Sequence, residues 1–242
     1  MPGRYVVAVG GADSAAAALT WAESHAALAG VPVVQVSVAD APSSRAPARS
    51  PGAQVAVLAP APISQALAQF LHDDDVLVIG TGKRGFIHSR VYGARGIQIA
   101  SAAPCNIAVV PEIDLRFRRG VVAGVTSDAA MAAVVDAAGS EAASRDDTLQ
   151  LVHSSFAGFV PGPVETAGPV LDHALAIGRA RRPGLSMRSR LSTRRPAEAL
   201  LDASRTAALL VIGAGTEHHL GSVAHDVLVN INAPVLLIRR TD

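Results

Sequence analysis

The stretch VLVIG at residues 76–80 recurs as LLVIG at residues 209–213. Each stretch is a run of four aliphatic residues that ends in glycine. A continuous apolar run of this length is typical of a strand that is buried on both faces, as in a parallel sheet. Open sheets of this kind bind ligands beyond the carboxyl ends of their strands. The glycines that end the two runs, Gly80 and Gly213, are therefore the first candidates for site residues.

Other segments recur around these stretches in the same order. The recurring pairs are residues 5–22 with 120–137, 61–71 with 196–204, and APCNIAVVP at 103–111 with APVLLIRR at 233–240. Four landmarks in one order indicate a duplicated domain.

Strand-like and helix-length segments alternate through both halves. This alternation predicts an α/β fold, in which each half is a doubly wound, five-stranded parallel sheet with helices on both faces. We expect two domains, at residues 1–113 and 119–242, with the short charged connector EIDLRFRR at 112–119 between them.

The first half has clear local signals for strands and helices. Asp13 or Ser14 is suited to cap the first helix, and Pro62 is suited to the first turn of a later helix. The apolar runs expected to be strands are at 6–9, 33–38, 76–79 and 107–110.

The second half contains more structure than the first between its second and third strands. It has a helix-length segment at 164–182 between strands expected at 149–152 and 185–191. The first half has only residues 40–52 in that place. We therefore expect its crossover to be an irregular, mobile loop without a helix.

Composition excludes several classes of function. The chain has 50% hydrophobic and 17% charged residues and a net charge of +1, which gives no electrostatic basis for binding nucleic acid or an anionic membrane. No apolar run approaches the roughly 20 residues that span a bilayer, and the N-terminal sequence lacks the layout of a signal peptide. We expect a cytoplasmic protein. Its single cysteine, Cys105, is expected to be a small buried packing residue.

The order of motifs in each half resembles the universal stress protein family, in its tandem two-domain type. The residues that carry the resemblance are V-x-V-I-G, a glycine-rich loop, a helix, and then A-P-C with a last apolar strand. The resemblance implies an adenine nucleotide alpha hydrolase-like fold and ATP as the candidate ligand. It also implies that the last strands, at 107–110 and 235–238, pair across a pseudo-two-fold axis, and that the chain forms a homodimer.

In nucleotide-binding members of the family, the loop reads G-x-x-G, nine residues, then G-S or G-T, and an Asp ends the first strand. Glycines let a backbone approach phosphate closely, and the following helix N-terminus attracts its charge. In the first half, Gly80, Thr81, Gly82 and Lys83 align with G-x-x-G, and Gly93-Ala94 aligns with G-S. The Asp position falls at Gly10. Gly11 and Val38 are further first-half candidates for the site. Lys83, Arg84 and Arg95, which is one residue past Gly93-Ala94, could supply positive charge to phosphates.

In the second half, the loop departs from the family pattern in a different way. Gly213-Ala214-Gly215-Thr216 is followed by only four residues before Gly221-Ser222, and the Asp position falls at Thr126. The first half therefore keeps the loop length but loses residues, whereas the second keeps G-S but loses length.

Other readings of these residues are weaker. The G-x-G-x-x-G at 80–85 follows the fourth strand rather than the first, so it is a poor dinucleotide fingerprint, and Arg84 stands where a Walker A loop needs Ser or Thr. No pair in the set Glu217, His218, His219 and His225 has an established metal-ligand spacing. The run Asp73-Asp74-Asp75 is predicted to be the solvated end of a helix.

Two functional hypotheses follow. The first is a non-catalytic signalling or interaction scaffold in the stress response, with degenerate nucleotide loops and unidentified protein partners. The alternative is an ATP-binding stress sensor that uses the loop at residues 80–94 of the first domain. No residue pattern supports hydrolase chemistry beyond a weak ATPase.

Overall fold

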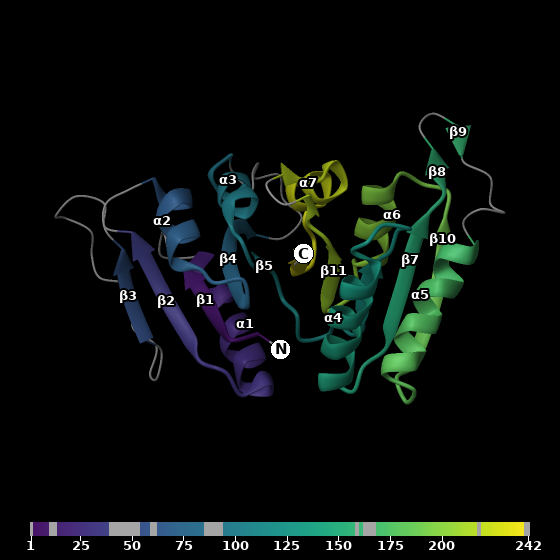
Figure 1. The fold of residues 1–242 in the computed structure, drawn as a ribbon, viewed down its shortest axis with the longest axis horizontal. Helices are drawn as coiled ribbons and strands as arrows, with labels where there is room; N and C mark the ends of the chain where they lie inside the picture. Colours follow the sequence, from purple (N-terminus) through teal and green to yellow (C-terminus); the bar gives the residue numbers. More distant parts are fainter. Residues whose placement is uncertain are drawn as a thin grey trace. The chain divides into compact units, whose positions relative to one another are not determined.

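The chain folds into two compact units, each described here by itself (Figure 1). The structure is a computed structural model, and it describes residues 2–9, 14–38, 54–58, 62–84, 94–157, 160–161, 168–216 and 219–239. Unit 1 contains the described residues up to Ile113 together with 219–220. Unit 2 contains those from Asp114 to Thr216 and from Gly221 to 239.

Unit 1 is a five-stranded parallel sheet with the strand order β5-β4-β1-β2-β3. Helix α1 packs on β1, β4 and β5, and α2 packs against α3. The elements are β1 (Arg4–Ala8), α1 (Ser14–Ala29), β2 (Val33–Val38), β3 (Gln54–Leu58), α2 (Ile63–Phe70), β4 (Asp75–Arg84), α3 (Ala94–Ala102) and β5 (Asn106–Glu112).

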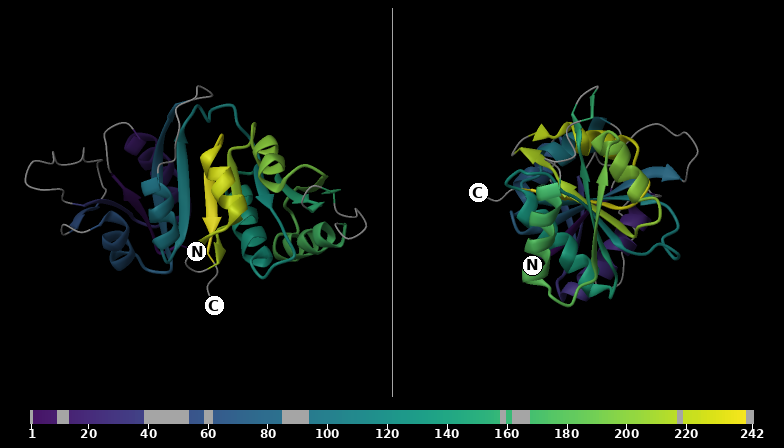
Figure 2. Two further views of the ribbon diagram at one scale, coloured as in Figure 1. Left: turned by 90° about the horizontal axis from the view of Figure 1, so that it is seen from above. Right: turned by 90° about the vertical axis from the view of Figure 1, so that its right-hand side faces the viewer.

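Unit 2 has a second five-stranded parallel sheet, with the order β10-β7-β6-β11-β14. Helix α4 packs against α5, and α6 packs against α7. Figure 2 shows helices on both faces of the strands. The elements of this sheet and its helices are β6 (Val121–Gly124), α4 (Met131–Ser144), β7 (Leu149–Ser154), α5 (Gly168–Arg181), β10 (Met187–Ser192), α6 (Pro196–Ala203), β11 (Leu209–Gly213), α7 (Ser222–Val229) and β14 (Val235–Ile238). Four two-residue strands lie in loops: β8 (Phe156–Ala157), β9 (Val160–Pro161), β12 (Gly215–Thr216) and β13 (His219–Leu220).

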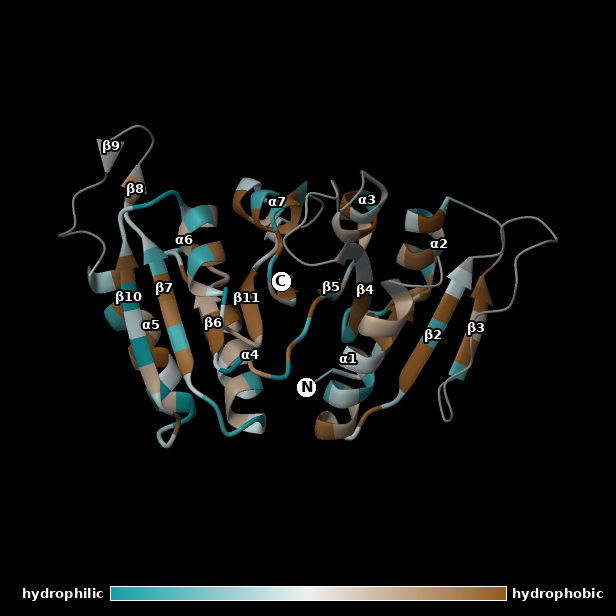
Figure 3. Ribbon diagram, turned by 180° about the vertical axis from the view of Figure 1, so that it is seen from behind, coloured by the Kyte–Doolittle hydropathy of each residue, from teal (hydrophilic) through white to brown (hydrophobic). Residues whose placement is uncertain are grey.

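The repeated stretches form equivalent strands, which confirms the predicted fold class of each half. Val78 of β4 lies opposite Val7 of β1, and Val211 of β11 lies opposite Ala123 of β6. All four aliphatic residues of each stretch are buried. In Figure 3, β11 is coloured hydrophobic along its length, whereas the edge strand β10 carries hydrophilic segments.

Several predicted boundaries differ from the observed ones. Strand β4 does not end at Ile79. It continues through Gly80, Gly82 and Lys83, because its backbone keeps pairing with β5 as far as Arg84 opposite Glu112, with an irregularity after Thr81. Helix α5 begins at Gly168, and β10 ends at Ser192. Pro62 is the N-cap of α2 and not a first-turn residue. The crossover expected to be mobile, at 40–52, lies outside the described residues.

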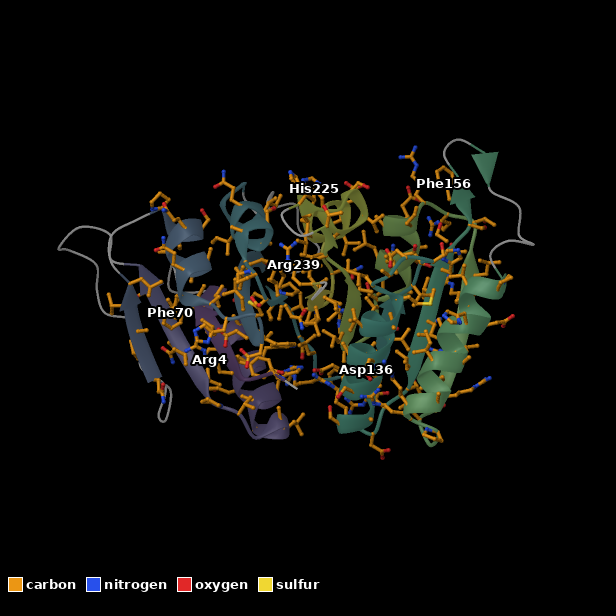
Figure 4. The ribbon with its side chains drawn as sticks, viewed as in Figure 1. Arg4, Phe70, Asp136, Phe156, His225 and Arg239 are labelled. Carbon is orange, nitrogen blue, oxygen red and sulfur yellow. The ribbon has the colours of Figure 1, made fainter. Side chains whose placement is uncertain are left out.

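The prediction that Asp73–Asp75 forms a solvated helix end is wrong for Asp75. Its side chain is only 1% exposed. Nε of Arg4 lies 2.8 Å from Oδ1 of Asp75, and Nη2 lies 3.0 Å from Oδ2. The guanidinium also lies 4.8 Å from the centre of the Phe70 ring (Figure 4). A carboxylate opens a buried strand here because a long-range ion pair compensates its desolvation.

The cysteine and the lengths of the described helices agree with the sequence analysis. Cys105 is fully buried, which confirms its predicted packing role. None of the described helices combines the length and apolar character needed to cross a bilayer.

Candidate functional site

The candidate site lies in unit 2, where the chain leaves neighbouring strands in opposite directions. From β6 the chain proceeds outward to β7 and β10, and it then returns to β11 and β14 on the other side of β6. The loops that follow β6 and β11 therefore separate above the sheet. Such a switch point is where open parallel sheets form a crevice for ligands.

A cavity of about 490 Å³ occupies this place. Its volume is within the range of roughly 300–1,000 Å³ that is typical of small-molecule sites. It is lined by the ends of β6, β7 and β11 and by the first turns of α4, α6 and α7. The lining residues used below are Gly124, Val125, Thr126, Asp128, His153, Ser154, Leu200, Ile212, Gly213, Gly215, Thr216, Gly221 and Ser222.

Glycines keep the backbone of the cavity accessible. A Cβ atom on Gly124 would lie 2.8 Å from Cδ2 of Leu200 and 2.9 Å from Cγ2 of Ile212, so only glycine fits there without rearrangement. Gly215 has a φ of +112°, which favours glycine. The Gly221 N–H donates to the Ala214 carbonyl at 2.9 Å and closes the loop between β11 and α7.

No described side chain caps the first turn of α4, α6 or α7, the three helices that begin at the cavity. Oδ1 of Asp128 accepts a hydrogen bond of 2.9 Å from the Ala130 N–H just before α4. Helix α7 follows Gly221, and no side chain caps it. The N–H groups of its first turn therefore remain available to an anion, with the partial positive charge of the helix end behind them.

Polar side chains at the end of β7 are already held by backbone groups. Nδ1 of His153 lies 2.8 Å from the Val125 carbonyl oxygen. The Ser154 hydroxyl donates to the Arg194 carbonyl at 2.6 Å and accepts a bond of 3.2 Å from the Phe156 N–H. Their hydrogen bonds hold them in place, and they do not bond each other as a nucleophile and base would.

No described residue that lines the cavity is Lys or Arg. Arg239, the residue after β14, is buried (Figure 4). Its Nη1 donates a hydrogen bond to the Thr216 carbonyl at 3.1 Å. It therefore supports the backbone of the loop and is not part of the lining. Among the described residues of the lining, an anion can therefore be attracted by backbone N–H groups and by the hydroxyl groups of Thr126, Thr216 and Ser222.

The structure brings all five predicted site residues of the second half into this one cavity. These residues are Thr126, Gly213, Gly215, Gly221 and Ser222. Thr126 and Ser222 are exposed, and they come from segments almost one hundred residues apart. Their role in binding a ligand stays a prediction.

The predicted site residues of the first half are less fully described. Gly80, Gly82 and Lys83 lie in β4, Val38 is the last residue of β2, and Ala94 and Arg95 begin α3. Gly10, Gly11 and Gly93 lie outside the described residues, so their proximity to the others stays a prediction.

Sequence reasoning missed four residues of the cavity: Gly124, Asp128, His153 and Ser154. Gly124 ends a predicted strand, but its contact with Leu200 becomes visible only when α6 is packed. His153 and Ser154 end β7, the strand beside β6. A rule that inspects polar residues at every strand end would have found both.

The described histidines of the set considered as metal ligands, His219 and His225, are exposed to solvent. His219 is exposed, the imidazole of His225 is 47% exposed, and Glu217 and His218 lie outside the described part of the chain. Within that part, one set of potential ligand atoms lies within 4.8 Å, from His72, Asp74 and Asp75. Asp75 is already occupied by its ion pair with Arg4.

Comparison with known proteins shows the fold. No family model and no curated protein matches the sequence. A universal stress protein from Archaeoglobus fulgidus DSM 4304 is 13% identical, and the alignment covers 100% of both chains with a TM-score of 0.74. A putative universal stress protein from Pseudomonas aeruginosa UCBPP-PA14 is 15% identical, with 98% of this chain and 93% of that chain covered and a TM-score of 0.62.

A third structure matches only half of the chain. It is the universal stress protein from Archaeoglobus fulgidus in complex with dAMP, which is 26% identical over 50% of this chain and 98% of its own, with a TM-score of 0.43.

Proposed function

We propose that unit 2 binds an adenine nucleotide and that the protein is a non-catalytic regulator in a stress response. The proposal starts from the tandem fold of the universal stress proteins, which the chain has along its whole length. One observation carries the proposal. The five second-half residues that the resemblance assigns to a nucleotide site line a single cavity at a strand switch point, where Thr126 lies with the segment 213–222 that is far from it in the sequence.

The residues of the cavity fit a nucleotide of low charge. The uncapped first turn of α7 and the glycines at 213, 215 and 221 offer backbone groups to a phosphate. Three phosphates would bring more negative charge than one helix end, about half an elementary charge, can compensate. Since no described cation lines the cavity, we propose a nucleoside monophosphate as the preferred ligand, with ATP bound more weakly.

A regulatory role is favoured over catalysis by the side chains at the end of β7. Hydrogen bonds hold His153 and Ser154 to separate backbone carbonyls, so neither is arranged to activate the other. Binding of the nucleotide at the first turn of α7 would alter the surface that a protein partner recognises. The protein partner is unidentified, and the cytoplasmic location stays an expectation from the sequence.

For unit 1, the scaffold hypothesis is favoured. The strand register shows that Ala8 of unit 1 corresponds to Gly124 of unit 2. The pair Val7–Val78 in unit 1 is equivalent to the pair Ala123–Val211 in unit 2, and Ala8 and Gly124 are the next residues along β1 and β6. A methyl group therefore stands where unit 2 has none. We propose that unit 1 supports interactions and that unit 2 binds the ligand.

Calorimetric titration with AMP of two matched variants tests this assignment. Gly213→Val places a branched side chain at the cavity, where a Cβ has room 3.6 Å from Cβ of Ala130, and Gly80→Val makes the same change at the equivalent strand end of unit 1. We expect Gly213→Val to weaken AMP binding at least about ten-fold, because the side chain competes with the ligand, and Gly80→Val to leave it unchanged.

Thermal unfolding of both variants serves as the folding control. Loss of binding in Gly80→Val alone would move the site to the loop of unit 1, as the sensor hypothesis has it. Absence of AMP binding in the unmodified protein would leave the scaffold as the function of both units.

A further inference from the structure

The hydrogen bond of His153 fixes which ring nitrogen can meet a ligand. The Val125 carbonyl oxygen only accepts hydrogen bonds, so Nδ1, 2.8 Å away, must carry the proton. In a neutral imidazole the other nitrogen, Nε2, is then an acceptor. Within the described part of the chain, no hydrogen bond to Nε2 is formed. His153 lines the cavity, so it presents one acceptor of fixed polarity.

Apart from Asp128, the polar side chains discussed at the cavity are not acceptors of fixed polarity. The hydroxyl groups of Thr126 and Ser222 are exposed and can rotate to donate or to accept. The Ser154 hydroxyl is used twice by the backbone. Asp128 is also an acceptor, but its Oδ1 already accepts from the Ala130 N–H and its side chain is exposed. Asp128 is therefore the competitor that an experiment must separate from His153.

The position of His153 suits the base of a nucleotide. It ends β7, and β6 lies between β7 and β11. Neighbouring strands are about 4.8 Å apart, so the ends of β7 and β11 are separated by about 10 Å. The glycine loop that leads to α7 follows β11. A phosphate at α7 would leave the base of the same nucleotide on the side of β7.

We propose that His153 is a specificity-determining residue, whose Nε2 accepts a hydrogen bond from the exocyclic amino group of a 6-amino purine. This inference rests on the proposed function and adds the reading of the base to it. A 6-oxo purine presents an oxygen at the same position. Two acceptors would then face each other in the cavity, and neither would be satisfied.

Titration with adenosine and inosine tests the inference, because the two nucleosides differ at this position. The proteins are the unmodified chain, His153→Phe, His153→Gln and Asp128→Asn. The unmodified protein is expected to bind adenosine at least about ten-fold more tightly than inosine, since a site built around a hydrogen bond rejects the ligand that cannot form it.

The variants separate a specific contact from a structural effect. His153→Phe keeps a ring of similar size but has no acceptor, so the adenosine preference should fall to within about two-fold of unity. His153→Gln places an amide oxygen near the position of Nε2 and should keep part of the preference. Asp128→Asn keeps an oxygen that can accept from the Ala130 N–H but removes the carboxylate charge, so a loss of the preference in this variant would assign the contact with the base to Asp128.

Each outcome decides the inference. An equal affinity for the two nucleosides in the unmodified protein overturns it, and so does a preference that survives in His153→Phe or disappears in Asp128→Asn. Binding of both nucleosides without preference leaves the proposed function intact. No binding of adenosine, inosine or AMP overturns the proposed function as well.

Discussion

At the scale of single residues, Gln35 shows how the two units have diverged. Gln35 lies opposite Val7 in unit 1, in the place that Leu151 takes opposite Ala123 in unit 2. Both side chains are fully buried. Among the residues that the structure describes, neither the nitrogen nor the oxygen of the Gln35 amide has a hydrogen-bond partner. A buried amide without partners costs free energy that a leucine at the same position does not.

We expect Gln35→Leu to raise the free energy of unfolding by about 1–3 kcal/mol, because it removes the unsatisfied amide and adds apolar contact. The measurement is urea unfolding followed by circular dichroism. The reverse change in the other unit, Leu151→Gln, is the matched control and should lower stability by about 3 kcal/mol. A loss of stability in Gln35→Leu would show that the amide has a partner in the folded protein.

At the scale of elements, ion pairs join the edge strand of unit 2 to the helix that follows it. Nη2 of Arg190, in β10, lies 3.0 Å from Oδ2 of Asp202, in α6. This hydrogen bond lowers the pKa of Asp202, and the charges of Arg190, Arg194 and Arg205 act in the same direction. The carboxylate is thus more acidic in the folded chain than in the unfolded one.

This shift predicts a dependence of stability on pH. A lowered pKa stabilises the fold above the unfolded value, about 3.9, and the contribution is lost as the pH falls through the folded value. Urea unfolding between about pH 5 and pH 2 should therefore show a smaller loss of stability in Asp202→Asn than in the unmodified protein. Asp172→Asn, on the exposed surface of α5, is the control and should follow the unmodified protein. Identical pH profiles for Asp202→Asn and the unmodified protein would contradict the role of this pair.

Local sequence predicts the elements better than it predicts their contacts. The repeated aliphatic runs are enough to place β4 and β11, because buried parallel strands need continuous apolar sequence. The ion pair of Asp75 depends on Arg4, which is 71 residues away, so the three consecutive aspartates alone suggest a solvated end. The extension of β4 past Gly80 likewise depends on pairing with β5.

Some residues of the candidate site can be predicted from local sequence, whereas others depend on contacts between distant segments. Glycines and small hydroxyl residues at 126, 213, 215, 221 and 222 stand at recognisable motif positions. His153 has no motif around it, and it enters the cavity only because β7 pairs with β6. The need for glycine at position 124 likewise comes from Leu200, on a helix that follows much later in the chain.

At the scale of the whole molecule, two units with the same sheet topology differ at corresponding strand ends. Unit 2 has a cavity at its switch point, with glycine at position 124 and His153 on the neighbouring strand. Unit 1 has Ala8 and Ser37 at the corresponding places of β1 and β2. We propose that duplication allowed one unit to keep a ligand site while the other was released from that constraint.

The central claim is that unit 2 binds the nucleotide, and a crystal structure of the protein with AMP at saturating concentration tests it most directly. The account predicts ligand density in the unit 2 cavity, with the phosphate at the first turn of α7 and the base beside His153. Density at the Gly80 strand end of unit 1, or an empty unit 2 cavity in such crystals, would contradict it.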